Sequence, residues 1–246
     1  MLKIISLLFL LSSVLFAAPE ATIPSVNLSL SAPDSPQQLV TVMNIIIVLT
    51  ILALAPTIVF VMTSFLRLIV VFSFLRQALG TTTMPPNTIL LTFALVLTFF
   101  IMEPTATKAY NEGVRPYLAE QIGYEEAFDR ASRPFKDFML KNTREKDLAL
   151  FYRIRNLPNP QTINDVPLTI IVPAFVISEL KTAFEIGFLI YLPFLVIDMV
   201  ISSVLMSMGM MMLPPVMISL PFKLLIFVLV DGWNLLVQKL VESYML

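Results

Sequence analysis

Cysteine and histidine are both absent from the 246-residue chain. The missing cysteine excludes disulfides, thiolate nucleophiles and sulfur-rich metal sites. The missing histidine removes the commonest metal ligand and the usual general base at neutral pH. Only six glycines are present, and none of them belongs to a phosphate-binding glycine-rich loop. The sequence therefore predicts a protein that is not an enzyme and that holds no cofactor or metal.

Charge is also scarce, because only 13% of the residues are charged and 57% are hydrophobic, whereas an average soluble domain is about 25% charged. No charge lies between Asp34 and Arg67, and none between Arg76 and Glu103. A stretch of about 20 apolar residues is long enough to cross the hydrocarbon layer of a membrane. The net charge of −1 gives no reason to expect a nucleic-acid partner. These features predict an integral membrane protein.

The amino terminus has the pattern of a secretory signal. Residues 1–18 combine the positive Lys3 with an apolar core, and small alanines precede Pro19. The alternative is an uncleaved first membrane helix, but the apolar core of about 13 residues is short for a span. Residues 19–38 are rich in proline, serine and alanine, and they are predicted to form a disordered leader. A signal peptide would place this leader outside the cytoplasm.

The rest of the chain divides into three regions. Residues 39–102 are predicted to form a first hydrophobic helical hairpin that turns around Pro85 and Pro86. Residues 103–167 carry ten acidic and ten basic residues, which predicts a water-facing helical insert. Residues 168–246 are predicted to form an amphipathic helix followed by a second hydrophobic hairpin. Arg67 and Arg76 then lie on the cytoplasmic side and the insert on the periplasmic side.

The turn of the second hairpin is rich in methionine. Six of the 14 methionines fall between Met206 and Met217, and Gly209, Pro214 and Pro215 prevent a plain helix there. Thioether side chains are flexible and polarizable, so several such loops meeting at an axis would make a deformable seal. The alternatives are an apolar turn in lipid or core, and a soft-metal site. The predicted gasket residues are Met206, Met208, Met210, Met211 and Met212.

Five charges lie inside the apolar blocks, where each is costly and normally faces a partner or a wet cavity. Asp198 and Asp231 are equally far from the Pro214-Pro215 turn, so a symmetric hairpin would place them at one depth. Three interpretations remain open: pairing with basic residues, a proton-coupled role, and exposure at the membrane rim. Neither aspartate has the context of an intramembrane protease. The five charges are Arg67, Arg76, Asp198, Lys223 and Asp231.

An amphipathic helix precedes the second hairpin. Ser178 is predicted to cap its amino terminus, and Glu179, Lys181 and Glu185 follow, the last two at an i,i+4 spacing on one helix face. This helix either is purely structural or docks its charged face on a neighbouring subunit. Its three charged residues therefore join the five above as candidate assembly charges.

Several motifs together resemble one known family. The stretch from Phe175 to Asp198, the block Ser-Met-Gly-Met-Met-Met-Leu-Pro-Pro that ends at Pro215, and the segments 219–223 and 230–233 resemble the FliP family of flagellar export proteins. Leu-Arg-Gln-Ala-Leu-Gly from residue 75 and Met-Pro-Pro-Asn87 are similar to it as well. The resemblance covers about half of the chain.

The resemblance implies an all-α membrane subunit whose long kinked helical hairpins assemble into a helical ring around a protein-conducting pore. It implies several copies of the chain, FliQ- and FliR-type subunits and other export-apparatus membrane proteins as partners. Unfolded flagellar proteins would pass through the ring, across the inner membrane at the flagellar basal body, with the methionine loop as constriction. The competing hypothesis is a small-solute or soft-metal-ion transporter that uses the buried charges and methionines.

Overall fold

The computed structural model describes residues 36–81, 83–158, 160, 165–210 and 212–245. The predicted signal peptide and the leader up to residue 35 lie outside them. The chain divides into two compact units, residues 1–50 and 51–246. The described part of the first unit is the beginning of helix α2 (Pro36–Val61), so residues 36–38 of the predicted leader are helical. The remaining description concerns the second unit.

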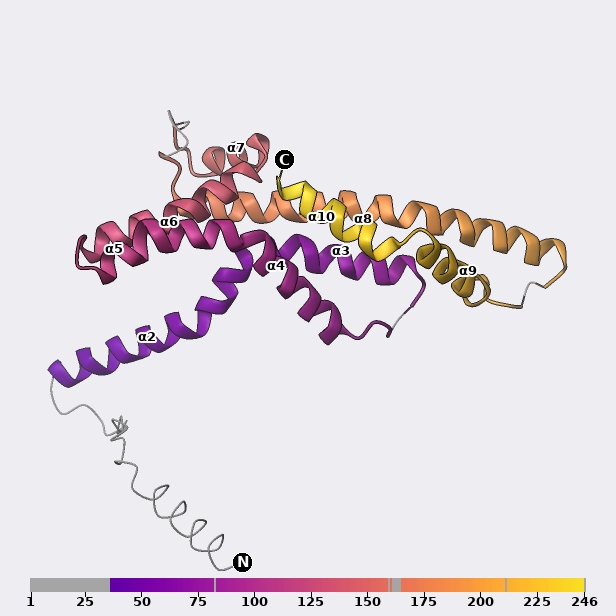
Figure 1. The fold of residues 1–246 in the computed structure, drawn as a ribbon, viewed down its shortest axis with the longest axis horizontal. Coiled ribbons are helices and arrows are strands. Elements are labelled where there is room, and N and C mark those ends of the chain that lie inside the picture. The colour runs from indigo at the N-terminus through magenta and orange to yellow at the C-terminus, as the bar shows by residue number, and fades with distance from the viewer. Residues whose placement is uncertain (1–35, 82, 159, 161–164, 211, 246) are drawn as a thin grey trace, which may run out of the picture. The chain divides into compact units, whose positions relative to one another are not determined.

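The described residues form helices and no strands, which confirms the predicted all-α class (Figure 1). After α2 come α3 (Phe65–Ala78), α4 (Asn87–Ala109), the π-helical turn η1 (Tyr110–Val114), and α5 (Arg115–Leu118). They are followed by α6 (Tyr124–Lys141), α7 (Glu145–Ile154), α8 (Leu168–Ser207), α9 (Pro215–Leu229) and α10 (Gly232–Met245).

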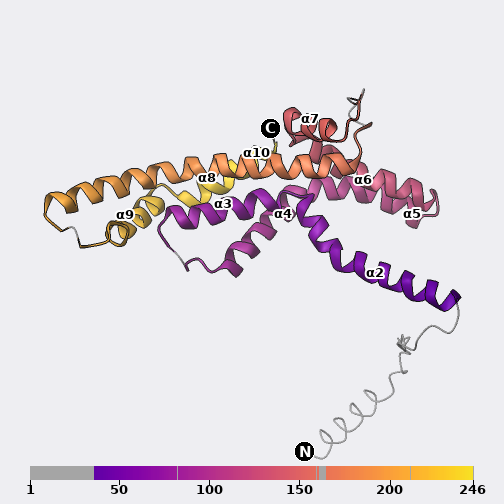
Figure 2. The ribbon, with the colours of Figure 1, turned by 180° about the vertical axis from the view of Figure 1, so that it is seen from behind.

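Helix α3 lies along the middle of α8, as both ribbon views show (Figure 1, Figure 2). Its buried side chains recur at helical spacing, at Leu68, Val71, Phe72 and Leu75. They form one apolar core with side chains of α4, α8 and α10. Gly80 follows the end of α3 and adopts a φ of +78°. Its N–H donates to the Gln77 carbonyl, and the Thr81 N–H donates to the Arg76 carbonyl. These two hydrogen bonds form a Schellman motif.

Three helical segments among the described residues are long and apolar enough to cross a membrane: Leu39–Ile58, Asn87–Leu118 and Leu168–Ser207. Helices α9 and α10 pass the same test only as a pair, and they are bent by 64° at their junction. Most large apolar side chains on these segments are exposed, including Phe99 and Leu189. That exposure is expected for helices that face lipid or pack against a neighbouring subunit.

The second apolar block is longer than the sequence indicated. Residues 88–102 alone are marginal for a crossing, but α4, η1 and α5 form one continuous helical segment of 32 residues. It passes Glu103, where the charged insert was expected to begin, and Pro104 without a break. The change of composition at Glu103 therefore does not coincide with the end of the helix.

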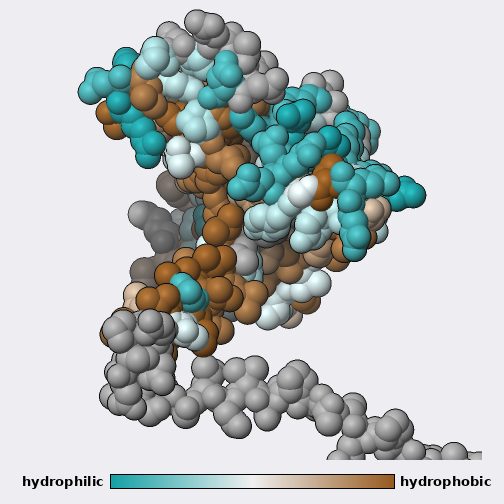
Figure 3. Space-filling view, turned by 90° about the vertical axis from the view of Figure 1, so that its left-hand side faces the viewer, coloured by the Kyte–Doolittle hydropathy of each residue, from teal (hydrophilic) through white to brown (hydrophobic). Residues whose placement is uncertain are grey.

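The charged insert folds back on its own chain. Its helices α6 and α7 are strongly amphipathic and pack against α4 and α8, while hydrophilic side chains cover their outer face (Figure 3). Met139, Tyr152 and Phe175 form part of a second small core between insert and α8. Burial there raises the pKa of the Tyr152 phenol, and the charge of Asp165 raises this pKa further.

Ser178 does not cap a helix, and this prediction is wrong. Helix α8 begins ten residues earlier, after Pro167, so Ser178 lies inside it. The buried Ser178 hydroxyl donates to Asp147 Oδ2 at 2.7 Å and accepts from the Arg144 backbone N–H at 3.0 Å. A serine in a helix interior needs such a partner when it is buried. Here it holds the start of α7 against α8.

Candidate functional site: the methionine turn and the buried charges

The methionine turn closes α8 in a defined geometry. Gly209 adopts a φ of +75°, its N–H bonds the Met206 carbonyl at 3.0 Å, and the Met210 N–H bonds the Leu205 carbonyl at 3.0 Å. These two bonds are a second Schellman motif, which requires a left-handed residue and therefore favours glycine. Pro214 precedes α9, and Pro215 is its first residue, a position that needs no backbone N–H.

The described methionines of the turn point away from the core of this chain. Met206, Met208, Met210 and Met212 are all exposed, and Met212 is 98% exposed. Met211 lies outside the described residues. The nearest charge along the chain on the α8 side is Asp198, eight residues before Met206. The turn is thus an uncharged apolar tip between two helices.

Asp198 forms an ion pair within the same chain. Lys223 Nζ of α9 lies 2.6 Å from Asp198 Oδ2 of α8, and the Ser219 hydroxyl donates to Asp198 Oδ1 at 2.5 Å. The Lys223 ammonium also donates to the Ala78 carbonyl at the end of α3, at 3.2 Å. Lys223 is nearly fully buried. One cation therefore ties α3, α8 and α9 together behind the methionine turn.

Asp231 does not lie beside Asp198, and the expectation of a symmetric hairpin is wrong. The second arm breaks between α9 and α10, where Asp231 is exposed and adopts a φ of +51°. Its carboxylate accepts from the Asn234 side-chain amide at 3.1 Å. Aspartate tolerates this left-handed conformation better than most residues. The break turns the chain, so distance from the turn along the sequence no longer gives depth.

Arg67 and Glu179 form the most buried ion pair in the described residues. Arg67 Nε donates to Glu179 Oε2 at 2.8 Å, and the two side chains are 4% and 0% exposed. The Tyr244 hydroxyl donates to Glu179 Oε2 at 2.6 Å, and the Arg67 guanidinium lies 3.7 Å from the centre of the Tyr244 ring. Arg67 also donates to the Ser243 hydroxyl at 2.8 Å. This cluster joins α3, α8 and α10.

The other predicted charges lie nearer the surface. Arg76 bonds the Asn87 side chain across the turn between α3 and α4, the turn that holds Pro85 and Pro86. Glu185 pairs with Arg144 of the insert at 2.6 Å. Lys181 is exposed on the same face of α8. The structure therefore joins the eight charges into separate local contacts and not into one site.

Four residues of these clusters were not predicted as site residues. Tyr244 and Ser243 lie in α10, Ser219 lies in the apolar helix α9, and Arg144 is one of ten basic residues in the insert. Only the helical spacing of Tyr244 with the buried Leu236 and Leu240 could have indicated its inward orientation. Partners of a buried charge that come from distant parts of the sequence leave no local pattern.

Within the described residues, no group of three or more acidic side chains could hold a metal ion. The charged side chains of the clusters are paired within the chain, so their role is structural. They hold helices in fixed positions against each other inside an apolar protein. The described methionines of the turn, in contrast, remain exposed.

Comparison with known proteins points to the same family that the sequence motifs resemble. The model of the FliP family matches residues 48–240. The flagellar biosynthetic protein FliP of Bacillus subtilis is 51% identical over 217 residues, which cover 88% of this chain and 98% of the relative. Those of Caulobacter vibrioides and Aquifex aeolicus are 54% and 50% identical, over 82% and 84% of this chain and 76% and 87% of the relatives. The chain belongs to the FliP family, and it is a membrane-embedded component of the flagellar protein export apparatus.

Proposed function

We propose that several copies of this chain line the export pore, and that the methionine turns together form its deformable seal. The observation that carries the proposal is the exposure of Met206, Met208, Met210 and Met212 at a charge-free tip. Flexible thioether side chains conform to surfaces of varied shape. They therefore close against each other when the pore is empty and around an unfolded chain of any sequence when it is in use.

The methionine side chains at the tip are flexible, but the backbone and the helices that carry them are held in place. The Schellman motif at Gly209 and the two prolines restrict the backbone of the turn. The buried Lys223 ammonium fixes α8, α9 and the end of α3 just behind it. A seal needs this combination, because the side chains must deform while the ring of backbones keeps its diameter.

The exposed apolar faces of α4, α8 and α9 pack against further copies, against FliQ- and FliR-type subunits, and against lipid. The complex lies in the inner membrane at the flagellar basal body, and the hydrophilic insert faces the periplasm. The exported proteins are unfolded flagellar subunits. The chain itself catalyses no reaction.

Replacement of Met208, Met210, Met211 and Met212 by alanine tests the seal. The variant should assemble into the export apparatus, because none of the three described methionines in this set is buried, but it should leak ions. Ion leak is measured in cells by the decay of the membrane potential, and assembly by native gels.

Two control variants separate softness from size. Met217→Ala removes a methionine that is 70% exposed but lies in α9, and it should not leak. Replacement of the four turn methionines by isoleucine keeps apolar bulk but stiffens the side chains, and it should hinder export more than it increases leak. The proposal is wrong if the alanine variant assembles, exports normally and leaks no more than the parent.

A further inference from the structure

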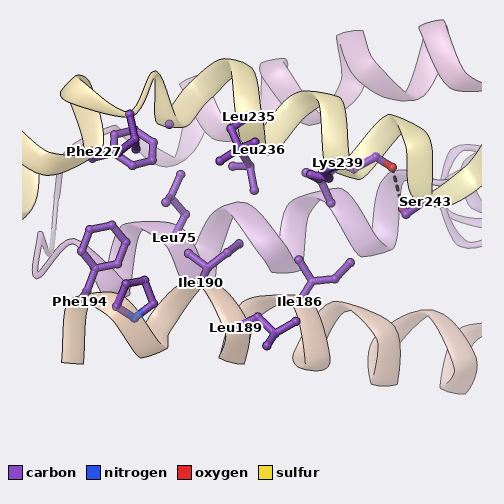
Figure 4. A pocket seen from close by; sticks show the side chains of 14 residues that line it. Leu75, Ile186, Leu189, Ile190, Phe194, Phe227, Leu235, Leu236, Lys239 and Ser243 are labelled. Carbon is purple, nitrogen blue, oxygen red and sulfur yellow. Dashed lines mark hydrogen bonds between the residues drawn. The ribbon is translucent and has the colours of Figure 1, made fainter. Parts of the chain in front are cut away.

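An apolar groove of about 460 Å³ opens between α8 and α10, with α3 at its base (Figure 4). Leu189 and Ile190 line one wall and Leu235 and Leu236 the other. Apolar cavities of about 300–1,000 Å³ are typical of ligand sites. None of the residues that line the groove belongs to the methionine turn.

The break between α9 and α10 creates the groove. Asp231 at positive φ and the 64° bend redirect α10 away from the line of α9. Gly232 is needed at this bend, because an added Cβ would lie 2.3 Å from the Phe227 ring. Phe227 and Phe194 then close one end of the groove.

The groove has a polar end and an apolar end. Lys239 is the one charged side chain among the described residues that line it, and it lies with Ser243 at the end opposite Phe194 and Phe227 (Figure 4). Glu242 Oε2 is 2.8 Å from Lys239 Nζ, and both side chains are largely exposed. Behind them the Arg67 charge is already balanced by Glu179. The mouth therefore presents one charge of each sign as an exposed ion pair, which contributes little by itself and can exchange its partners for a headgroup of both charges.

The length of the groove fits one half of a membrane. Gly232 and Ser243 both line it, and the eleven residue steps between them on α10 span about 16 Å at 1.5 Å per residue. One leaflet of hydrocarbon is about 15 Å thick. An acyl chain lying along α10 would thus reach from the Phe194 end to the level of its own headgroup.

We propose that this groove binds one acyl chain of a zwitterionic membrane phospholipid, with the headgroup phosphate at Lys239 and the ammonium at Glu242. The lipid fills the space that the bend leaves between α8 and α10. It thereby supports α10, whose Ser243 and Tyr244 complete the buried Arg67 cluster.

The test uses the full chain in native membranes and a phosphatidylethanolamine that carries a photoreactive group in its acyl chain. After illumination, labelled residues are mapped by peptide mass spectrometry. Labels should concentrate on the groove walls. Leu189→Trp and Leu235→Trp, which fill the groove from opposite walls at exposed positions, should each abolish this label. Leu225→Trp alters an equally exposed leucine outside the groove and should leave the label unchanged.

A second arm tests the headgroup. Lys239→Gln should lower labelling by the phospholipid about fivefold, the effect of one lysine near a phosphate, and should not change labelling by a photoreactive diacylglycerol. Equal labelling of the groove and of the exposed face around Leu225 would show ordinary surrounding lipid and overturn the proposal. A groove that remains unlabelled would overturn it as well.

Discussion

At the scale of single residues, Arg67 and Glu179 place two full charges where solvent does not reach. A buried ion pair contributes little net stability, because its desolvation offsets most of the attraction. Removal of one partner is costly, since it leaves the other charge buried alone. The Tyr244 hydroxyl and the Ser243 hydroxyl satisfy further atoms of the pair. The pair therefore selects one arrangement of α3, α8 and α10 over other apolar packings.

Glu179→Gln should accordingly destabilise the fold by about 3–5 kcal/mol, because the Arg67 guanidinium stays buried without a counter-charge. The measurement is the denaturant concentration at which the detergent-solubilised protein becomes sensitive to protease. The double replacement of Arg67 and Glu179 by methionine should lose much less stability than the single one. Glu242→Gln, at the exposed Lys239 pair, should have little effect. Equal losses in the single and double variants would contradict this account.

At the scale of elements, the packing of α3 on α8 depends on a missing side chain. A Cβ at Gly187 would lie 2.6 Å from the Phe74 ring, so the helices approach closely only because this residue is glycine. Phe74 also packs edge-on against Phe184, one turn earlier on α8. The contact between a glycine and an aromatic ring sets the distance between the two helices.

Gly187→Ala should destabilise the protein by about 1–3 kcal/mol through overpacking, measured by the same protease assay. Gly187→Ala combined with Phe74→Leu should recover part of the loss, because the smaller side chain leaves room for the new methyl group. Gly123→Ala is the matched control, since a Cβ there meets nothing within 4 Å. A Gly187 variant as stable as the Gly123 variant would show that the helices adjust without strain.

At the scale of the whole molecule, the absence of cysteine makes the proposed orientation testable, with the insert on the periplasmic side and the hairpin tip towards the cytoplasm. A single cysteine at Tyr124, at the start of α6 and 70% exposed, reports on the insert, and one at Met212 reports on the hairpin tip. In whole cells, a maleimide that cannot cross the inner membrane should label Tyr124→Cys but not Met212→Cys. After permeabilisation both should react. Labelling of the tip but not of the insert in intact cells would reverse the orientation.

Much of the architecture follows from local composition. The uncharged stretches predict membrane helices because hydrocarbon excludes charge. The prolines and Gly209 predict where the hairpins turn, because these residues restrict or free single backbone angles. The methionine-rich turn is visible in the sequence alone. The bounds of α4 and α8 are not, because α4 continues past Glu103 and α8 begins before Ser178, where the insert packs against both helices.

The sequence by itself thus determined that this is an all-helical membrane protein of the FliP family with a methionine-rich apolar turn, because composition, helical spacing and motifs are local properties. Only the tertiary structure decided which charges meet. Arg67 and Glu179 are 112 residues apart in the chain. Asp198 pairs with Lys223, and it does not lie beside Asp231, because a bend at one left-handed residue redirects the last helix. That bend also opens the groove between α8 and α10, a feature that depends on three helices at once.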